Sequence, residues 1–320
     1  MATLGEFELI ERFFTRPTGR AALGIGDDCA LLAPAPGLAL AVSCDMLIEG
    51  RHFLSTVAPD RLGHKALAVN LSDLAACGAR PLAFTLALAL PRAEEAFLEG
   101  FARGMFALAE RHGCELVGGD TTRGPLAICI TVFGEVARKS ALLRSGARPG
   151  DEIWVSGCLG DARLALEAFR GTLSLEASAF RQARDAMEMP EPRVGLGLGL
   201  RGVARSAIDV SDGLAGDLAH ILRCSDVAAV VDVDALPRSA VLAAQPQATQ
   251  RECLLAGGDD YELVFTAAPE RRADVLAAGA RAGVQVTRIG EVTAGAGLRL
   301  VDRSGQPIAH EVASFDHFKS

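Results

Sequence analysis

The sequence predicts a protein of two α+β domains. Its 320 residues are long for a single core, since a typical domain holds about 150 residues. Apolar runs of strand length alternate with helical patterns, yet neither half shows the regular strand–helix–strand order of a doubly wound sheet. The turn-rich segment 144–151 separates the two halves. We expect an N-terminal domain over residues 1–140 and a C-terminal α+β domain over residues 141–320.

Apolar runs bounded by turn residues give the individual elements. In the first half, strands are predicted at 38–44, 82–90, 114–117 and 126–136, and helices at 59–77 and 94–111. In the second half, strands are predicted at 153–156, 207–210, 227–233, 262–266 and 284–289, and helices after Asp161, after Ser211 and at 269–282. The first strand runs into Asp45, so we expect it to place a carboxylate at its C-terminal end.

The composition argues against several classes of protein. A net charge of −8 disfavours nucleic acid as a partner, because phosphate backbones need a footprint of Lys and Arg. Small phosphorylated ligands remain compatible with it, because a bound cation inverts the local charge. The eight cysteines form no CxxC pair, which predicts reduced thiols. The sequence shows no signal peptide or membrane-spanning stretch, so we expect a cytoplasmic protein without membrane contact.

Aspartates that stand beside glycines or after apolar runs recur along the whole chain. A single Asp next to Gly is an ordinary turn signal. Here several of them are expected at strand ends or on inward helix faces, where an unpaired carboxylate is costly and needs a partner. The clusters are Gly26-Asp27-Asp28, Asp45, Asn70 with Asp73, Gly118-Gly119-Asp120, Asp209-Val210-Ser211-Asp212-Gly213 and Gly257-Gly258-Asp259-Asp260.

The helix predicted over 59–77 shows why a metal is the better explanation. Ala66, Asn70, Asp73 and Cys77 fall on one helix face, which is otherwise small and apolar. An aspartate there breaks the pattern of a buried face unless it meets a cation. Carboxylate oxygens are hard ligands that suit Mg²⁺, which is typically held by a few carboxylates together with substrate phosphates. Carboxylates on several segments indicate more than one ion.

The segment Ser211-Asp212-Gly213 lies between a predicted strand and a predicted helix. Its amides could bind a phosphate at the helix N-terminus. Ser211 could equally be the N-cap of that helix, and the two interpretations are compatible. The chain has no GxxxxGK[ST] motif and no set of protein-kinase signatures, so any nucleotide site uses another architecture.

Five motifs stand in order along the chain: Gly24-Ile-Gly-Asp-Asp-Cys-Ala30, Asn70-Leu-Ser-Asp-Leu-Ala-Ala76, Gly118-Gly-Asp-Thr-Thr122, Asp209-Val-Ser-Asp-Gly213 and Gly258-Asp-Asp-Tyr-Glu-Leu263. Taken together and in this order, they resemble the motifs of the bacterial thiamine-monophosphate kinases. The resemblance covers nearly the whole chain. It implies a fold similar to aminoimidazole ribonucleotide synthetase and selenophosphate synthetase, in which the N-terminal domain pairs with its twin in a homodimer.

The resemblance also implies ligands and roles for particular residues. The ligands are ATP as co-substrate, several Mg²⁺ ions and thiamine monophosphate. The implied metal ligands are Asp28, Ser43, Cys44, Asp45, Asp73, Asp120, Asp209 and Asp212. The implied ATP contacts are Gly119, Asp120, Arg144 and Ser211, and the implied contacts to thiamine monophosphate are His52, Asp259 and Phe315.

Three positions depart from the family pattern. Cys44 stands where Thr is usual, which matters little if the family contact is a backbone carbonyl. Asp259 replaces the commoner Glu and shortens the reach toward the substrate by one methylene. Phe315 replaces Tyr or Trp, which keeps an aromatic face for a cationic thiazolium but loses the polar tip.

The expected reaction is direct in-line transfer from ATP to a terminal oxygen of thiamine monophosphate. That phosphate has a second pKa near ~6, so it is mostly deprotonated at neutral pH and no general base is expected. The nearest alternative is a related enzyme that activates another small acceptor, which would differ at His52, Asp259 and Phe315. A non-catalytic cation-binding protein would need a calcium-loop pattern, which the sequence lacks. A purely structural oligomer would not explain Asp73 on an apolar face.

Overall fold

The computed structural model describes residues 5–25 and 29–308. Residue contacts divide the chain into two compact units. Unit 1 comprises Met1–Leu74 and Ala79–Lys139, and unit 2 comprises Ala75–Gly78 and Ser140–Ser320. Among the described residues, no helix is both long and apolar enough to cross a membrane.

Unit 1 is built on a four-stranded sheet in the order β1-β4-β2-β3. Strands β1 and β2 run antiparallel to β4, whereas β2 and β3 are parallel. The strands are β1 (Ala39–Ile48), β2 (Arg80–Leu90), β3 (Glu115–Arg123) and β4 (Ala127–Val136). The helices are α1 (Glu6–Leu9), the π-helical turn η1 (Ile10–Phe14), α2 (Pro59–Ala76), α3 (Glu95–His112) and the 3₁₀ turn η2 (Arg138–Ser140), of which α2 and η2 end in residues of unit 2.

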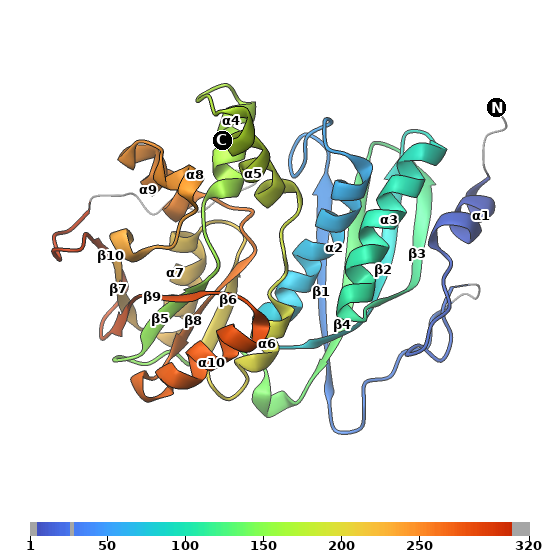
Figure 1. The fold of residues 1–320 in the computed structure, drawn as a ribbon. Helices are drawn as coiled ribbons and strands as arrows, with labels where there is room; N and C mark the ends of the chain where they lie inside the picture. The colour runs from blue at the N-terminus through green and yellow to red at the C-terminus, as the bar shows by residue number, and fades with distance from the viewer. Residues whose placement is uncertain (1–4, 26–28, 309–320) are drawn as a thin grey trace. The chain divides into compact units, whose positions relative to one another are not determined.

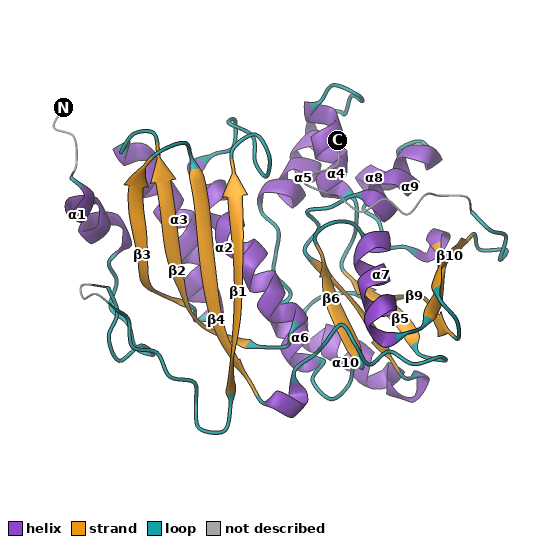
Figure 2. Cartoon of the chain, turned by 180° about the vertical axis from the view of Figure 1, so that it is seen from behind, coloured by secondary structure: helices purple, strands orange, loops and turns teal. Residues whose placement is uncertain are grey.

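The two faces of this sheet differ. Helices α2 and α3 cover one face, against which Leu86, Ile130 and Val132 are buried (Figure 1). The view from behind shows the other face of the sheet without a described helix of unit 1 over it (Figure 2). On β1 the side chains alternate between the two faces, as expected for a strand covered on one side. The large apolar side chains exposed on the open face of β1 are Leu40, Val42, Met46 and Ile48.

Unit 2 is built on a six-stranded sheet in the order β10-β7-β9-β5-β8-β6, in which only β10 and β7 are parallel neighbours. Helix α7 lies on one face of this sheet, and α6 and α10 lie on the other (Figures 1 and 2). The strands are β5 (Glu152–Ser156), β6 (Ser206–Val210), β7 (Ala228–Asp232), β8 (Glu262–Ala267), β9 (Val286–Thr293) and β10 (Gly297–Val301). The helices are α4 (Asp161–Phe169), α5 (Ala177–Glu188), α6 (Val194–Gly199), α7 (Leu214–Ser225), α8 (Ala240–Ala243), α9 (Gln247–Ala256) and α10 (Arg272–Ala282), with 3₁₀ turns η3 (Val233–Ala235) and η4 (Pro269–Arg271).

Two predicted strand boundaries are wrong in a way that affects the site. Strand β1 continues to Ile48, so Asp45 lies within the strand and not at its end. Strand β3 continues to Arg123, so Asp120 also lies within a strand and not in a turn. Gly119 pairs with Leu86 of β2 there, and a Cβ at Gly119 would lie 1.9 Å from the carbonyl oxygen of Leu86. This glycine therefore permits a close approach between two strands.

Candidate functional site

In unit 1, strand β1 and helix α2 bring together four polar side chains, which we call the β1–α2 cluster: Ser43, Asp45, Asn70 and Asp73. The Ser43 hydroxyl donates to Asp73 Oδ2 at 2.5 Å, and the Asp45 amide donates to Asn70 Oδ1 at 3.0 Å. Asn70 Nδ2 donates in turn to the carbonyl oxygen of Ala66 at 3.0 Å. The predicted inward orientation of Asn70 is confirmed, since its exposed fraction is 1%.

The donor atoms of the β1–α2 cluster fit Mg²⁺. Ser43, Asp45 and Asp73 offer hydroxyl and carboxylate oxygens, whereas the amide of Asn70 is hydrogen-bonded to the backbone of Asp45 and Ala66. Among residues 5–25 and 29–308, no group of three or more His, Cys, Asp or Glu side chains could hold a metal alone. Two carboxylates that leave room for phosphate and water ligands are what Mg²⁺ usually takes, whereas transition metals favour imidazole or thiolate.

Cys44 lies between Ser43 and Asp45 in sequence but its thiol lies on the open face of the sheet. Its Sγ atom is 3.4 Å from Sγ of Cys129 on the neighbouring strand β4. Because successive side chains of a strand point to opposite faces, the thiol points away from the β1–α2 cluster. Any contribution of Cys44 to a metal there must come from its backbone carbonyl.

Gly119 and Asp120 lie on β3, at the opposite edge of the sheet from β1. Strands β4 and β2 separate these two edges, so Asp120 is about 14 Å from Asp45 at three strand spacings. Asp120 pairs with Ala87, whose side chain is exposed on the open face. Within unit 1, Asp120 therefore does not join the β1–α2 cluster.

His52 lies in the loop that follows β1. Its Nδ1 atom accepts a hydrogen bond from the Ile48 amide at 3.0 Å, and its carbonyl oxygen accepts one from Lys65 Nζ at 3.1 Å. Because Nδ1 is an acceptor, the neutral ring carries its proton on Nε2. These two hydrogen bonds fix His52, a predicted contact to the substrate, beside the end of β1.

In unit 2, two loops are hydrogen-bonded to each other at the end of β6; we call them the clasped loops, residues 211–213 and 258–261. Asp217 Oδ2 accepts from the Ser211 amide at 3.1 Å and from the Asp212 amide at 3.0 Å. The Asp259 amide donates to the carbonyl oxygen of Ser211 at 2.9 Å. The Tyr261 hydroxyl donates to Asp259 Oδ1 at 3.0 Å. These contacts place three predicted site residues, Ser211, Asp212 and Asp259, side by side.

The backbone of the second loop is unusual. Asp259 has φ of 67° and Tyr261 has φ of 51°, both in the left-handed region that residues with side chains rarely adopt. A Cβ at Gly258 would lie 2.4 Å from the carbonyl oxygen of Ser211, so only glycine lets the two loops approach this closely. Gly258 therefore serves the contact between the loops.

The N-cap interpretation of Ser211 is wrong, and phosphate binding by the amides of residues 211–213 stays a prediction. Helix α7 begins at Leu214, and its N-cap is Gly213 without a side-chain cap. The amides of Ser211 and Asp212 donate to Asp217. The side chains of Ser211 and Asp212 stay the predicted contacts to ATP and metal.

The charges around the clasped loops act on one another. Asp217 is 3% exposed, and burial raises its pKa to about 7; Asp212 adds to this rise, whereas the two amide hydrogen bonds and Arg144 oppose it. Burial, Arg223 and Arg144 lower the pKa of His220, which lies one helical turn after Asp217. Arg144 and Asp212 thus lie within electrostatic reach of both groups. Asp209, on β6 opposite Leu263, is 5% exposed.

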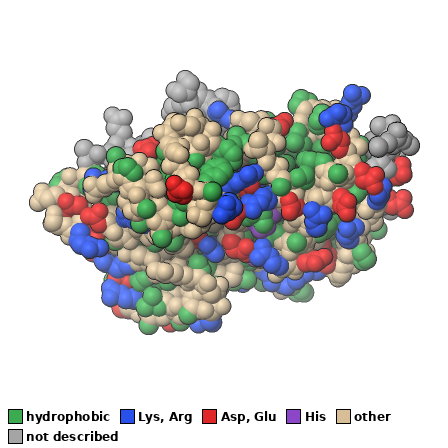
Figure 3. Space-filling model, turned by 45° about the horizontal axis from the view of Figure 1, so that its top comes forward, with side chains coloured by type: hydrophobic (Ala, Val, Ile, Leu, Met, Phe, Trp, Pro, Cys, Tyr) green, Lys and Arg blue, Asp and Glu red, His purple; other side chains and the backbone are tan. Residues whose placement is uncertain are grey.

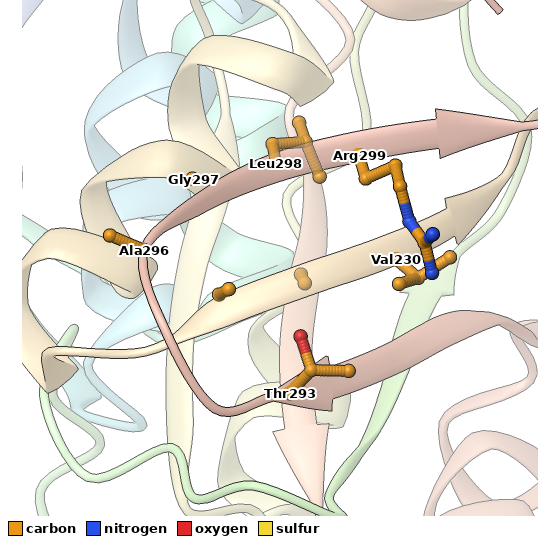
Figure 4. A pocket seen from close by; sticks show the side chains of 8 residues that line it. Val230, Thr293, Ala296, Gly297, Leu298 and Arg299 are labelled. Atoms are coloured by element: carbon orange, nitrogen blue, oxygen red, sulfur yellow. The ribbon is translucent and has the colours of Figure 1, made fainter. Parts of the chain in front are cut away.

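A hollow of about 330 Å³ lies elsewhere in unit 2, at the β7–β10 edge of the sheet (Figure 4). Its lining includes Val230, Thr293 and Leu298, with Arg299 as its charged side chain. None of the predicted site residues lines it, and β7 is four strands from β6. We therefore do not assign the site to this hollow.

On the face shown in Figure 3, acidic and basic side chains are interspersed.

The sequence reasoning did not single out Asp217, and it named Asp260 and Tyr261 within motifs without giving them a role. Burial raises the pKa of Asp260 well above its usual value, and both of its carboxylate oxygens accept from the Gly160 amide. The signal for Asp217 was present, because it follows Leu214 and Ala215 and precedes Leu218 on the apolar face of α7. Two predicted residues, Asp28 and Phe315, lie outside the described residues, and their roles stay predictions.

Comparison with known proteins gives consistent matches over both units. The family models "AIR synthase related protein, N-terminal domain" and "AIR synthase related protein, C-terminal domain" match residues 26–136 and 148–303. The chain is 43% identical to thiamine-monophosphate kinase of Escherichia coli K12 over 98% of each chain.

Two solved structures are also similar to the chain. The thiamine-monophosphate kinase of Stenotrophomonas maltophilia K279a superposes with a TM-score of 0.84 at 46% identity, covering 90% of this chain and 92% of that one. The structure described as AaThiL complexed with AMPPCP and TMP superposes with a TM-score of 0.77 at 30% identity, covering 89% of each chain.

Proposed function

The chain belongs to the thiamine-monophosphate kinase family, and from this premise we propose that it transfers the γ-phosphate of ATP to thiamine monophosphate, yielding thiamine diphosphate. The observation that carries the proposal is the 43% sequence identity to a kinase of that name over 98% of both chains. A relative whose structure is described with AMPPCP and TMP supports the two substrates. The clustered oxygen donors of unit 1 support a metal-dependent phosphoryl transfer.

We assign Mg²⁺ to this reaction because the residues present fit it. Ser43, Asp45 and Asp73 of the β1–α2 cluster would hold one ion, with the Cys44 carbonyl as a further donor. The other predicted ligands lie on separate segments, which supports more than one ion; they are Asp28, Asp120, Asp209 and Asp212. Bound Mg²⁺ would offset the repulsion between two polyanions and stabilise charge on the transferring phosphoryl oxygens.

The protein's own task in this proposal is to position two phosphates for in-line attack. The acceptor is a phosphate oxygen that is already largely deprotonated at neutral pH, so no side chain has to remove a proton. The exposed guanidinium of Arg144 and the Ser211 hydroxyl are the assigned contacts to ATP, together with Gly119 and Asp120. His52, Asp259 and Phe315 are the assigned contacts to thiamine monophosphate.

We also propose a homodimer formed through the open face of the unit 1 sheet. Val42 and Met46 are 56% and 53% exposed there, and Leu40 and Ile48 continue the same apolar row. A contiguous apolar face of this kind marks an interaction surface in a protein of mixed surface charge. Sedimentation equilibrium should give twice the mass of one chain, and a monomer mass would contradict the pairing.

The direct test measures ADP release with Mg²⁺ and three acceptors: thiamine monophosphate, thiamine and an aminoimidazole ribonucleotide precursor. Turnover that depends on thiamine monophosphate is expected, with no turnover on the other two. Turnover on another acceptor alone would instead identify a related enzyme of the same fold. Omission of Mg²⁺ should abolish the reaction, and restoration by Mg²⁺ should recover it.

A further inference from the structure

Asp217 is hydrogen-bonded through both its amide and its side chain to the turn that joins β6 to α7. Its amide donates to the carbonyl oxygen of Gly213 at 3.0 Å, which is the first hydrogen bond of the helix. Its side chain reaches back, and the single atom Oδ2 accepts from two successive amides, those of Ser211 and Asp212. The conformation of this turn therefore depends on one buried carboxylate oxygen. A buried amide that loses its acceptor is costly, so removal of this oxygen should release the turn.

The second loop depends on the same turn. The Ser211 carbonyl accepts from the Asp259 amide, and the carbonyl of Val210 accepts from the Tyr261 amide, both at 2.9 Å. Asp259 and Tyr261 are held in left-handed conformations that are unfavourable for residues with a Cβ, so the surrounding contacts must stabilise them. Movement of Ser211 would remove one of those contacts and let Asp259 shift.

We propose that Asp217 is a positioning residue for the phosphoryl-transfer site, whose carboxylate fixes Ser211 and Asp212 directly and Asp259 through Ser211. The inference rests on the proposed function, because it takes these three residues as contacts to ATP, Mg²⁺ and thiamine monophosphate. Asp217 itself touches none of these ligands in the proposal. Its effect is to set the direction in which the Asp212 carboxylate and the Ser211 hydroxyl project.

A matched control exists in the same unit. Asp232 Oδ1 also accepts from two amides, those of Asp234 at 2.9 Å and Ala235 at 3.3 Å. This contact caps the turn after β7, and β7 is about 19 Å from β6 at four strand spacings. Asp232→Ala removes the same kind of interaction without touching the clasped loops. A difference between the Asp217 and Asp232 variants thus reports the location of the lost contact, because both variants lose a carboxylate oxygen that accepts from two amides.

The first measurement needs only the unmodified protein. Hydrogen exchange resolved to single amides should show that Ser211 and Asp212 exchange slowly, because both amides are bonded to a buried acceptor. Exchange as fast as in an open loop would overturn the proposal even if no variant at Asp217 folds. This readout requires neither substrate nor turnover, so it is independent of whether thiamine monophosphate is the acceptor.

The second measurement compares Asp217→Ala, Asp217→Asn and Asp232→Ala. Calorimetry with Mg²⁺ and AMPPCP gives affinity, and ADP release gives the half-saturating Mg²⁺ concentration and kcat. In Asp217→Ala we expect affinity for Mg²⁺ with AMPPCP to weaken by about tenfold or more, since two bonds to one oxygen are lost. The half-saturating Mg²⁺ concentration should rise in parallel, with a smaller loss of kcat at saturating Mg²⁺.

Asp217→Asn keeps one oxygen that can accept from both amides, so it should recover most of that affinity. Asp232→Ala should lower the free energy of unfolding without changing either Mg²⁺ readout. Equal Mg²⁺ readouts in Asp217→Ala and Asp232→Ala would overturn the positioning role. If instead no variant or wild-type protein turns over thiamine monophosphate, the function fails while exchange and calorimetry still decide the role of Asp217.

Discussion

The β1–α2 cluster of unit 1 and the clasped loops of unit 2 fix their polar groups by different means. In the cluster, a strand and an 18-residue helix hold the donors, and side chains such as Ser43 and Asp73 meet directly. In the loops, no regular element holds Asp212 or Asp259, and buried acceptors such as Asp217 fix the backbone instead. A substitution in the cluster should therefore remove chemistry and leave the fold intact. A substitution at Asp217, beneath the clasped loops, should instead displace the side chains assigned to ATP, metal and substrate without removing any of them.

The largest expected effect is at Asp73. Asp73→Asn removes the charge that would face Mg²⁺ but keeps an oxygen for the Ser43 hydroxyl, so the helix should stay in place. We expect kcat to fall by about a hundredfold or more, the size usual for one electrostatic group at a phosphoryl or oxyanion site, with little change in the free energy of unfolding. ADP release and urea denaturation measure the two quantities.

Asp60→Asn, in the first turn of the same helix, is the control and should leave kcat unchanged. Asp120→Asn should give a loss like that at Asp73, because Asp120 is assigned both to metal and to ATP. Near-normal turnover in Asp73→Asn would contradict the metal-holding role of the cluster. Near-normal turnover in Asp120→Asn alone would restrict that role to β1 and α2.

An effect of intermediate size concerns the partly buried carboxylate Asp260, in the second of the clasped loops. Burial raises its pKa well above 3.8 in the folded protein, whereas the unfolded chain ionises it near ~3.9. Above that pH the unfolded state releases a proton that the folded state keeps. The free energy of unfolding should therefore fall as pH rises toward the folded pKa, by at most about 1.4 kcal/mol per pH unit.

Asp260→Asn cannot ionise and keeps one oxygen for the Gly160 amide, so this contribution to the pH dependence should vanish. Urea denaturation at several pH values above ~5 measures it. Asp226→Asn, at an exposed left-handed helix end that Asn tolerates, should leave the slope unchanged. Parallel curves for wild type and Asp260→Asn would show that Asp260 is ionised in the folded protein.

The smallest expected effect is at Tyr261, the single tyrosine of the chain. Tyr261→Phe removes the hydroxyl that donates to Asp259 but keeps the ring and the amide contact to Val210. One such hydrogen bond contributes about 0.5–1.5 kcal/mol, so KM for thiamine monophosphate should rise by up to about tenfold. KM for ATP serves as the internal control and should not change. A rise in KM for ATP alone would contradict the assignment of Asp259 to thiamine monophosphate.

Sequence periodicity predicted the fold class and most of the elements well. The run 59–77 gave α2, and the inward face with Asn70 follows from the helical period. The lengths of β1 and β3 were underestimated, because polar residues such as Asp45 and Asp120 looked like strand ends. Helices α5 and α9 and strand β10 were not predicted. The glycine-rich sequence around Asp120 reads as a turn, and only pairing with β2 makes it a strand.

The sequence by itself determined that this chain is a two-domain α+β protein with recurrent aspartates, and its ordered motifs determined the family. Those properties follow from local periodicity and from spacing along the chain. Only the tertiary structure decided which aspartates lie in the β1–α2 cluster, which lie apart from it and which support a loop. Ser43 contacts Asp73 and Asp45 contacts Asn70 between β1 and α2, Asp120 lies at the far sheet edge, and Asp217 is buried behind a turn. Burial and hydrogen-bond partners distinguish these roles, and both arise from contacts between distant segments that no local pattern encodes.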